Sequence, residues 1–508
     1  MRIKKIAINS IIETSFYIVI AFIGLLKIRF IISGLGTEVN GYFQFINQII
    51  TYIILAEAGL SAGILFKYYK PMANNDRVAV SKLFEGSKRI FRRIGLIIIA
   101  LSILMIPLLM FYGSGSGITT QIIVAFSMLI LAQAIPFLTK QRAYNALLAA
   151  DQKRYVFAFI SNSIRVLCDI AIIFMVIRFQ NIVVIAFVSL ISSLILNIVM
   201  NIVGKRMYSW LNKKHGVDTS ATDMSKDLIV HQVGNVVYNN IDIVIIMTFL
   251  GPVMVSIYAA YNYIVFFIKE LMDRNNNMIF NVFGNISAKE NKEQAFKLFS
   301  EYIALFNFLA LVLATCFILG ARSFVLLWIG KSEFFLSFVV ILLFGLIIFF
   351  DMLVKPIISK VNANGLYKET KYISLIISGI NLGLSIILVI NFGIAGTLLA
   401  TCIASFIGLL LRVRVIRQKI LDNNQIRKVL SYQFLVCVIF GIFLVGYYFI
   451  EKRLLTYMTS YINWFLIMGG IAIITTIFFF IFQYVTDKSF RDLVVKLKNY
   501  RWGEKENA

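Results

Sequence analysis

Polar side chains recur at helical spacing within two otherwise apolar stretches near the middle of the 508-residue chain. In the first stretch they follow the pattern i, i+4, i+7, i+8 and i+11, which places them on one face of a helix with 3.6 residues per turn. These residues are His231, Asn235, Tyr238, Asn239 and Asp242. Leu-Gly-Pro at 250–252 ends this helix, and the next helix carries Tyr258, Tyr261 and Asn262. Such groups inside a membrane face protein or water instead of lipid, so they predict a polar pathway.

Three basic residues lie inside predicted membrane-spanning segments. Arg165 is about ten residues inside the segment 156–177, roughly 15 Å deep, where a charge is costliest. It either forms a structural pair with Asp169 at i+4 or serves as a cation that binds phosphate or gates the pathway. Lys27 and Arg29 lie near the outer end of the first segment. Long side chains can reach the headgroups from there, so snorkelling and cargo binding both stay open.

Acidic residues in the spans are candidates for coupling transport to an ion gradient. Asp242 is the first choice, with a hydrogen-bonded packing role as the alternative. Asp169 is a second candidate, and Glu57, near the inner end of the segment 41–66, is a third for which a structural role is the alternative. A further polar face in that segment consists of Gln44, Asn47 and Gln48. For any single amide, hydrogen bonding between helices competes with a place on the pathway.

The composition requires a membrane. The chain is 60% hydrophobic, its mean hydropathy is +0.85, and many runs reach the roughly 20 apolar residues that a spanning helix needs. The four cysteines lie in predicted spans without metal-ligand spacing, so we expect no disulfide, no metal and no cofactor.

The apolar runs predict an all-α, polytopic protein with about 14 transmembrane helices. The segments are 6–33, 41–66, 94–112, 119–139, 156–177, 182–204, 228–250, 253–272, 299–321, 335–354, 372–390, 395–411, 432–450 and 462–486. With this topology, 41 of the 49 Lys and Arg residues fall on one side of the membrane. The positive-inside rule then places both termini in the cytoplasm. The net charge of +24 therefore reflects topology and attraction to anionic membrane lipids, and nucleic acid is not an expected partner.

The segments group into two lobes of six helices. We expect an N-terminal lobe at 1–204, a cytoplasmic loop at 205–227, a C-terminal lobe at 228–416, two extra spans within 417–486 and a cytoplasmic tail at 487–508. A weak repeat supports the two lobes, because GLGTEVNGYFQFIN at 34–47 is similar to FLGPVMVSIYAAYN at 249–262. Repeated halves around a site at the membrane midplane are a common plan of transporters.

Three stretches resemble one transporter family. They are NNIDIVIIMTFLGPVMVSIYAAYNYI, GLGTEVNGYF with AEAGLSAGI, and FGIAGTLLATCIAS. They are similar to the polysaccharide transporters, or Wzx-type flippases, of the multidrug/oligosaccharidyl-lipid/polysaccharide (MOP) superfamily, whose relatives include lipid II flippases and MATE drug exporters. The resemblance implies two pseudo-symmetric lobes around a central cavity that opens to each side in turn.

The same resemblance implies a cargo and a location. The cargo would be an undecaprenyl-pyrophosphate-linked oligosaccharide that crosses the bacterial cytoplasmic (inner) membrane for assembly of surface polysaccharide. A polysaccharide polymerase and the chain-length machinery are the further partners that we consider. Such a headgroup cannot cross about 30 Å of hydrocarbon unaided, and it needs cations for phosphate with amides and phenols for sugar. The basic residues and the polar stripes described above supply both kinds of group.

Two other function classes stay open. A MATE-like antiporter of cationic drugs would need an acidic cavity, which Asp242, Asp169 and Glu57 could provide. A membrane-embedded enzyme that modifies glycans would need a catalytic constellation. The sequence has two histidines and shows neither a nucleotide-binding loop nor a nucleophile–base pair, so we expect a protein that is not an enzyme.

Overall fold

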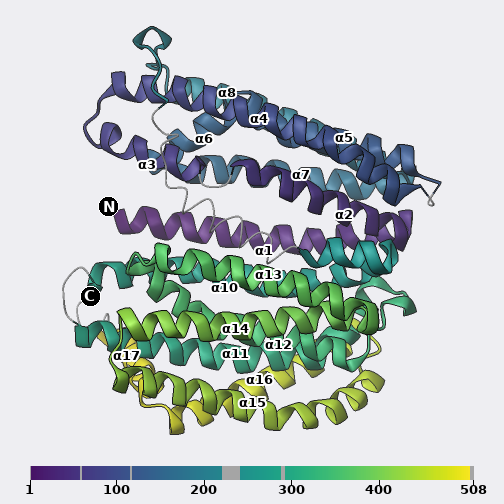
Figure 1. Cartoon of the computed structure of the whole chain (residues 1–508), viewed down its shortest axis with the longest axis vertical. Helices are drawn as coiled ribbons and strands as arrows, with labels where there is room; N and C mark the ends of the chain where they lie inside the picture. The colour runs from purple at the N-terminus through teal and green to yellow at the C-terminus, as the bar shows by residue number, and fades with distance from the viewer. Residues whose placement is uncertain (1, 58–59, 115–116, 220–240, 288–291, 504–508) are drawn as a thin grey trace. The chain divides into compact units, whose positions relative to one another are not determined.

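The computed structural model describes residues 2–57, 60–114, 117–219, 241–287 and 292–503, and these residues form helices and no strands (Figure 1). The chain divides into two compact units, residues 1–259 and 260–508. This confirms the predicted all-helical class.

The first unit begins with eight helices. They are α1 (Arg2–Leu35), α2 (Thr37–Ile54), α3 (Leu60–Ala73), α4 (Arg77–Gly113), α5 (Thr119–Leu138), α6 (Gln141–Ala150), α7 (Arg154–Phe179) and α8 (Ile182–Met207). A short apolar helix at Ile241–Leu250 follows. The first turns of α10 (Pro252–Ser287) complete the unit.

The second unit contains the rest of α10 and seven further helices. They are α11 (Lys292–Ile329), α12 (Phe338–Ala363), α13 (Tyr367–Phe392), α14 (Ile394–Lys419), α15 (Asn423–Tyr457), α16 (Tyr461–Thr486) and α17 (Lys488–Gly503). Helix α11 packs against α12, α15, α16 and α17, and α13 packs against α14. The extra spans α15 and α16 therefore share the core of this unit, where Phe440 stacks on Phe349 with ring centroids 4.3 Å apart.

Twelve of the described helices are long and apolar enough to cross a membrane. They correspond to twelve of the fourteen predicted segments. One continuous span at 41–66 is wrong, because α2 ends at Ile54 and a 3-10 turn at Leu55–Glu57 precedes α3. The sequence has Gly59 just after this turn, and glycine costs about 1 kcal/mol relative to alanine inside a helix. The Glu57 carboxylate also accepts a local hydrogen bond from the Ser61 hydroxyl. Of the segment 228–250, residues 241–250 are described.

Apolar packing fixes α1 against α7. Ile31 of α1, Ile172 and Val176 of α7, and Ile185 of α8 form a buried cluster. Gly34 lets the two helices approach closely, because a Cβ at this position would lie 3.0 Å from Cγ1 of Val176. The cluster lies about one helical turn from the polar residues of α1 and α7 described below.

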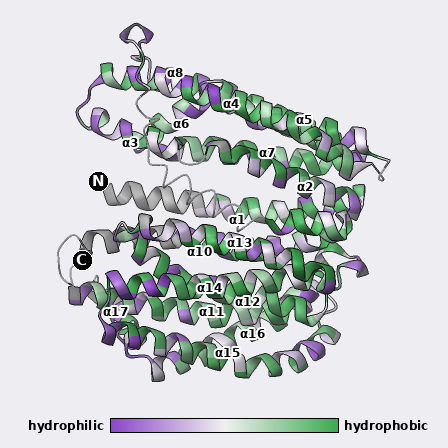
Figure 2. Cartoon of the chain, in the orientation of Figure 1, coloured by the Kyte–Doolittle hydropathy of each residue, from purple (hydrophilic) through white to green (hydrophobic). Residues whose placement is uncertain are grey.

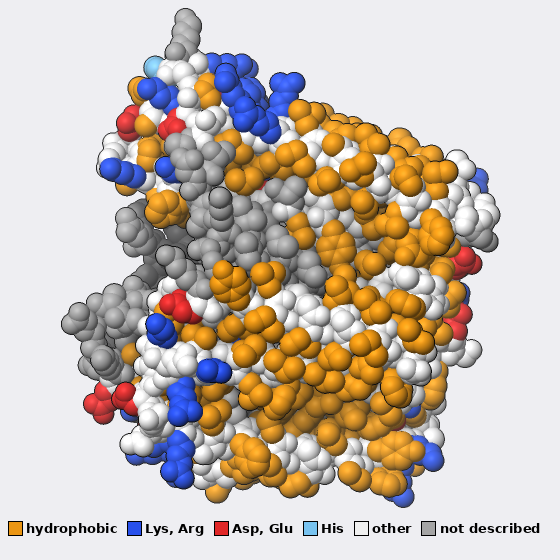
Figure 3. Space-filling model, viewed as in Figure 1, with side chains coloured by type: hydrophobic (Ala, Val, Ile, Leu, Met, Phe, Trp, Pro, Cys, Tyr) orange, Lys and Arg blue, Asp and Glu red, His pale blue; other side chains and the backbone are white. Residues whose placement is uncertain are grey.

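The outward surfaces of the helices suit lipid. Figure 2 shows hydrophobic residues along the middle of α4 and α5, and hydrophilic residues along α17. In Figure 3, hydrophobic side chains cover most of the visible surface of each unit, and Lys and Arg gather near the helix ends. On α15, Phe434, Ile442 and Val445 are each more than 60% exposed. In a water-soluble protein such surface would be a binding patch or a liability, whereas here it extends over whole helices and indicates contact with a bilayer.

Candidate functional site

Two matching glycine turns introduce the polar helices of the first unit. Gly36 precedes α2 with a φ of 91°, and Gly251 precedes α10 with a φ of 83°. L-residues with a side chain rarely adopt this left-handed conformation, so glycine is required at both turns. They are the Leu-Gly positions of the sequence repeat, and both start a helix with a polar face. The backbone thus repeats where the sequence repeats.

The first turns of α2 and α10 touch backbone to backbone. A Cβ on Gly41 would lie 1.8 Å from the carbonyl oxygen of Pro252, closer than any real contact. Beside this crossing, the amide nitrogen of Asn40 donates to Ser256 Oγ at 2.6 Å, and the Gln44 amide donates to Asn40 Oδ1 at 3.4 Å. Small and polar residues therefore join the two repeat elements.

Gly41→Ala should disrupt this crossing. The added methyl group meets backbone atoms that cannot rotate away, so we expect a loss of about 1–3 kcal/mol in unfolding free energy, typical of overpacking. Thermal unfolding in detergent measures the loss. Gly379→Ala in α13 is the matched control, because a Cβ there meets nothing within 4 Å. Equal stability of the two variants would contradict the close approach.

A buried acidic group lies near this crossing. Asp242 is 6% exposed, and its Oδ2 accepts a hydrogen bond of 2.8 Å from the Tyr258 hydroxyl. Tyr52 of α2 lies within electrostatic range of both Asp242 and Tyr258. The Gln48 side chain is also buried, and its amide nitrogen has no hydrogen-bond partner among the described residues. Carboxylate, phenol and amide groups gathered in this way can hold a proton or a small cation.

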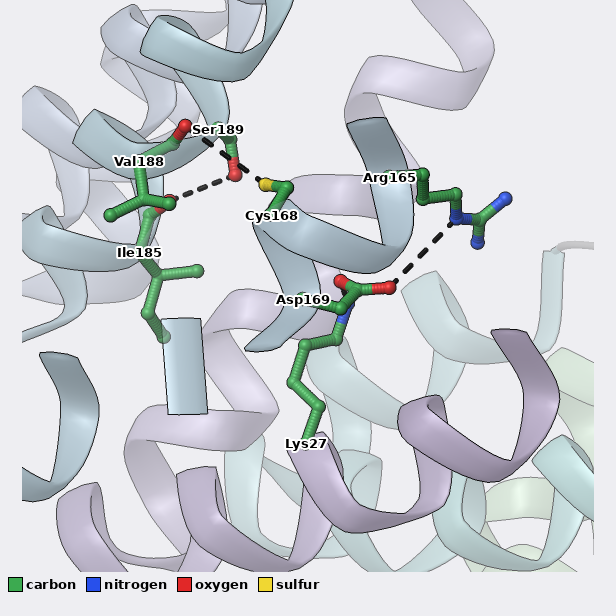
Figure 4. Close-up of polar contacts among 7 residues, drawn as sticks. All are labelled: Lys27, Arg165, Cys168, Asp169, Ile185, Val188 and Ser189. Atoms are coloured by element: carbon green, nitrogen blue, oxygen red, sulfur yellow. Dashed lines mark hydrogen bonds and ion pairs between the residues drawn. The ribbon is translucent and has the colours of Figure 1, made fainter. Parts of the chain in front are cut away.

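A second charged cluster joins α1 to α7 (Figure 4). Lys27 Nζ lies 2.5 Å from Asp169 Oδ1, whereas Arg165 Nε lies 4.0 Å from Asp169 Oδ2. The Asp169 side chain is 6% exposed and that of Lys27 is 21% exposed. Asp169 is therefore paired mainly with Lys27 of another helix, and the i+4 pair that the sequence suggested is the weaker contact.

Arg165 lies on the interior face of α7, yet its side chain is 64% exposed. Positions i−7, i+4, i+7 and i+11 relative to Arg165 share its face. These positions are Ala158, Asp169, Ile172 and Val176, the buried residues of α7. The exposed apolar residues Leu167, Ile170 and Phe174 lie on the opposite face. Figure 4 shows the guanidinium end directed away from Asp169. Because Lys27 neutralises Asp169, the charge of Arg165 remains available on the interior face.

The other predicted residues lie in mixed surroundings. Arg29 and Asn262 are half-buried, and the Asn47 amide donates to the Phe43 carbonyl of its own helix at 2.8 Å. Tyr261, expected to line the pathway, is fully buried. Its hydroxyl donates to the Phe334 carbonyl at 2.7 Å. Asn235 and Asn239 lie outside the described residues.

Glu57 forms an ion pair on the predicted cytoplasmic side. Its Oε2 lies 3.4 Å from Arg142 of α6, and 12% of its side chain is exposed. The Arg142 guanidinium also lies over the Phe137 ring, 4.4 Å from its centroid. These contacts connect the turn after α2 to α6.

Sequence reasoning missed a buried ion pair in the second unit. Arg322 Nη1 lies 3.2 Å from Glu451 Oε1, with side chains 7% and 3% exposed. Both residues were expected in short external loops, because hydropathy drops at charged residues. Helices α11 and α15 instead continue past these positions and bury the pair. Nothing in the sequence near Arg322 or Glu451 indicates that these two side chains pair with each other.

A charged network lies at the other end of this unit. The i, i+4 pair of Asp351 and Lys355 is present at 3.0 Å. Lys355 also binds Asp273 at 2.5 Å, and Lys269 lies 3.4 Å from Asp351. These charges join α10 to α12.

No protein-family model matches the chain, and no curated protein matches it. Solved structures match over most of its length. An inward-facing multidrug resistance MATE family transporter of the MOP superfamily aligns with a TM-score of 0.62 at 14% identity, covering 80% of this chain and 98% of that one. The lipid II flippase MurJ, in an inward closed conformation, aligns with a TM-score of 0.64 at 18% identity, covering 96% and 100%. A eukaryotic MATE transporter aligns with a TM-score of 0.57 at 13% identity, covering 84% and 96%.

These similarities establish the fold. The chain has the all-helical architecture of MOP superfamily transporters, as the sequence resemblance implied. The twelve candidate spans within its described residues make it a multi-pass membrane protein.

Proposed function

We propose that this protein is a flippase that moves undecaprenyl-pyrophosphate-linked oligosaccharide from the inner to the outer leaflet of a bacterial cytoplasmic membrane. The cargo would be a repeat unit for surface polysaccharide, such as O-antigen, capsule or exopolysaccharide. Transport would follow alternating access within the MOP fold.

The observation that carries this proposal is the available charge of Arg165. It is the twelfth residue of the 26-residue helix α7, about 17 Å along an axis of about 39 Å. A cation near the middle of a membrane is costly unless it faces protein or water. A guanidinium forms paired, charge-assisted hydrogen bonds with phosphate. An interior arginine therefore suits the pyrophosphate of the cargo, while amides such as Gln44 suit sugar hydroxyls.

Asp242 favours a second candidate, a MATE-like antiporter that exchanges cationic drugs for ions. Asp169 and Glu57 are each engaged by a basic residue, and each pair has little net charge to offer a cation. The carboxylate of Asp242, bonded to Tyr258, is the acidic group best suited to that chemistry.

The wild-type protein in proteoliposomes separates the two candidates. A fluorescent oligosaccharide linked to a polyprenyl pyrophosphate serves as one probe, and a fluorescent organic cation serves as the other. The proposal expects the first probe to become accessible on the opposite leaflet and the second to stay where it was added. Transport of the cation alone would replace the proposal with the antiporter.

Asp242→Asn should uncouple transport from an ion gradient. Asparagine keeps the shape and can still accept the hydrogen bond from Tyr258, but it carries neither a titratable proton nor a charge. The measurement is the transport rate with a proton or sodium gradient divided by the transport rate without one. We expect this ratio to fall to about one in Asp242→Asn, because the coupling group is lost.

The matched control is Asp76→Asn. Asp76 caps α4 by accepting a bond from the Ala79 amide at 2.9 Å, and asparagine caps helices equally well. This variant should retain wild-type coupling. If Asp242→Asn also retains it, Asp242 has a packing role only.

A further inference from the structure

A cavity of about 680 Å³ lies within the second unit, between the first turns of α11 and α15 and the junction of α16 with α17. Its volume lies in the range of small-molecule sites. Basic side chains, hydroxyl groups and apolar groups all line it. The basic residues are Arg427, Lys428 and Lys488, and the hydroxyl-bearing residues are Ser300, Ser431, Tyr432 and Ser489.

The basic residues of this cavity have charge to offer a ligand. Arg427, Lys428 and Lys488 are exposed, and none forms an ion pair with another described residue. The acidic lining residues are engaged: Asp492 lies 3.4 Å from Lys297, and Asp487 accepts the Ser489 amide at 2.8 Å. Burial also raises the pKa of Asp487 above its usual value, and the three basic side chains outnumber the two acidic ones in the lining. The lining is therefore cationic.

The cavity lies at the level where a lipid headgroup would be. Helix α16 ends at Thr486, and the hydrophilic helix α17 begins at Lys488, so the chain leaves the apolar layer beside the cavity. The positive-inside pattern places this end on the cytoplasmic side. Arg427 and Ser431 line the cavity, and their face of α15 continues at helical spacing through Phe434, Val438 and Ile442, which are exposed.

From this continuity we propose that the cavity binds the phosphate headgroup of an anionic bilayer phospholipid, whose acyl chains lie along the exposed face of α15. The guanidinium and ammonium groups pair with phosphate, and the serine and tyrosine hydroxyls suit the glycerol portion. The exposed apolar face of α15 favours a lipid over a soluble phosphate as the ligand, because a soluble phosphate has no acyl chains to lie along that face. The lining includes none of the residues proposed to bind the cargo, and occupancy of the cavity can be measured without transport.

The test uses the full-length protein in phosphatidylcholine nanodiscs that contain phosphatidylglycerol with a photoreactive acyl chain. Native mass spectrometry counts the bound phosphatidylglycerol, and crosslinking locates its acyl chain. The test variant is Arg427→Ala/Lys428→Ala. The matched control is Lys452→Ala/Arg453→Ala, because these residues form an adjacent, exposed basic pair near the opposite end of the same helix.

We expect the test variant to bind phosphatidylglycerol about 25-fold more weakly, since each basic residue near an anionic surface contributes roughly fivefold. The control should bind as the wild type does, and crosslinks should map to residues 434–445. Equal losses in both variants, or crosslinks elsewhere, would overturn the site. Displacement of the lipid by glycerol phosphate at equal concentration would identify the ligand as a soluble phosphate instead and would also overturn the proposal.

Discussion

Arg165→Ala should abolish transport of the pyrophosphate-linked cargo while the protein still inserts and folds. The substitution removes the available cation from the interior face of α7 and leaves the Lys27–Asp169 pair intact. Charge-assisted contacts of arginine with phosphate contribute about 1.5–3 kcal/mol each. Loss of two such contacts lowers affinity by more than a hundredfold. The flipping assay in proteoliposomes measures the loss.

Two further variants separate charge from folding. Arg178→Ala removes an exposed arginine from the last turn of the same helix and should transport normally. Arg165→Lys keeps the charge but loses the planar, paired geometry, so we expect transport between that of the wild type and that of Arg165→Ala. Transport by Arg165→Ala equal to that of Arg178→Ala would exclude Arg165 from the path.

Glu451→Ala should cause the largest loss of stability. It leaves the buried guanidinium of Arg322 without its carboxylate. Breaking a buried pair on one side typically costs about 3–5 kcal/mol, because an uncompensated charge stays buried. Arg322 also lies over the Phe335 ring, 4.7 Å from its centroid, which retains the charge in place. The measurement is the free energy of unfolding in mixed detergent.

The control for this prediction is Glu333→Ala, which removes the partner of Lys331 from an ion pair of 3.7 Å with side chains 42% and 38% exposed. Exposed pairs contribute at most about 1 kcal/mol, so this variant should be nearly as stable as the wild type. The double variant Arg322→Met/Glu451→Leu should recover most of the stability, because apolar residues of similar size replace buried pairs well. Equal losses for Glu451→Ala and Glu333→Ala would show that burial of the pair contributes little.

The sequence predicted features that depend on local pattern. Hydropathy located twelve spans that the structure describes, because a run of about 20 apolar residues matches the length that a membrane-spanning helix needs. The Leu-Gly repeat located the two turns at Gly36 and Gly251, because only glycine adopts their backbone conformation readily.

Features that depend on contacts between helices could not be predicted in this way. Helical spacing paired Asp169 with Arg165, whereas Asp169 binds Lys27, 142 positions away in the sequence. Nothing in the periodicity of α1 or α7 specifies which helix lies opposite. Hydropathy predicts loops at Arg322 and Glu451 for a related reason. It scores each residue by its own preference for lipid or water, and it takes no account of two charges that neutralise each other inside a helix bundle.

The phosphate-binding role of Arg165 is tested most directly by the affinity of the purified protein for its cargo headgroup. Native mass spectrometry can compare a short-chain polyprenyl-pyrophosphate oligosaccharide with the same oligosaccharide on an uncharged polyprenyl alcohol, in the wild type and in Arg165→Gln. We expect the wild type to bind the pyrophosphate form at least tenfold more tightly, an energy of about 1.4 kcal/mol, and Arg165→Gln to bind the two forms equally. Equal affinity of the wild type for both forms, or an undiminished preference in Arg165→Gln, would contradict this role.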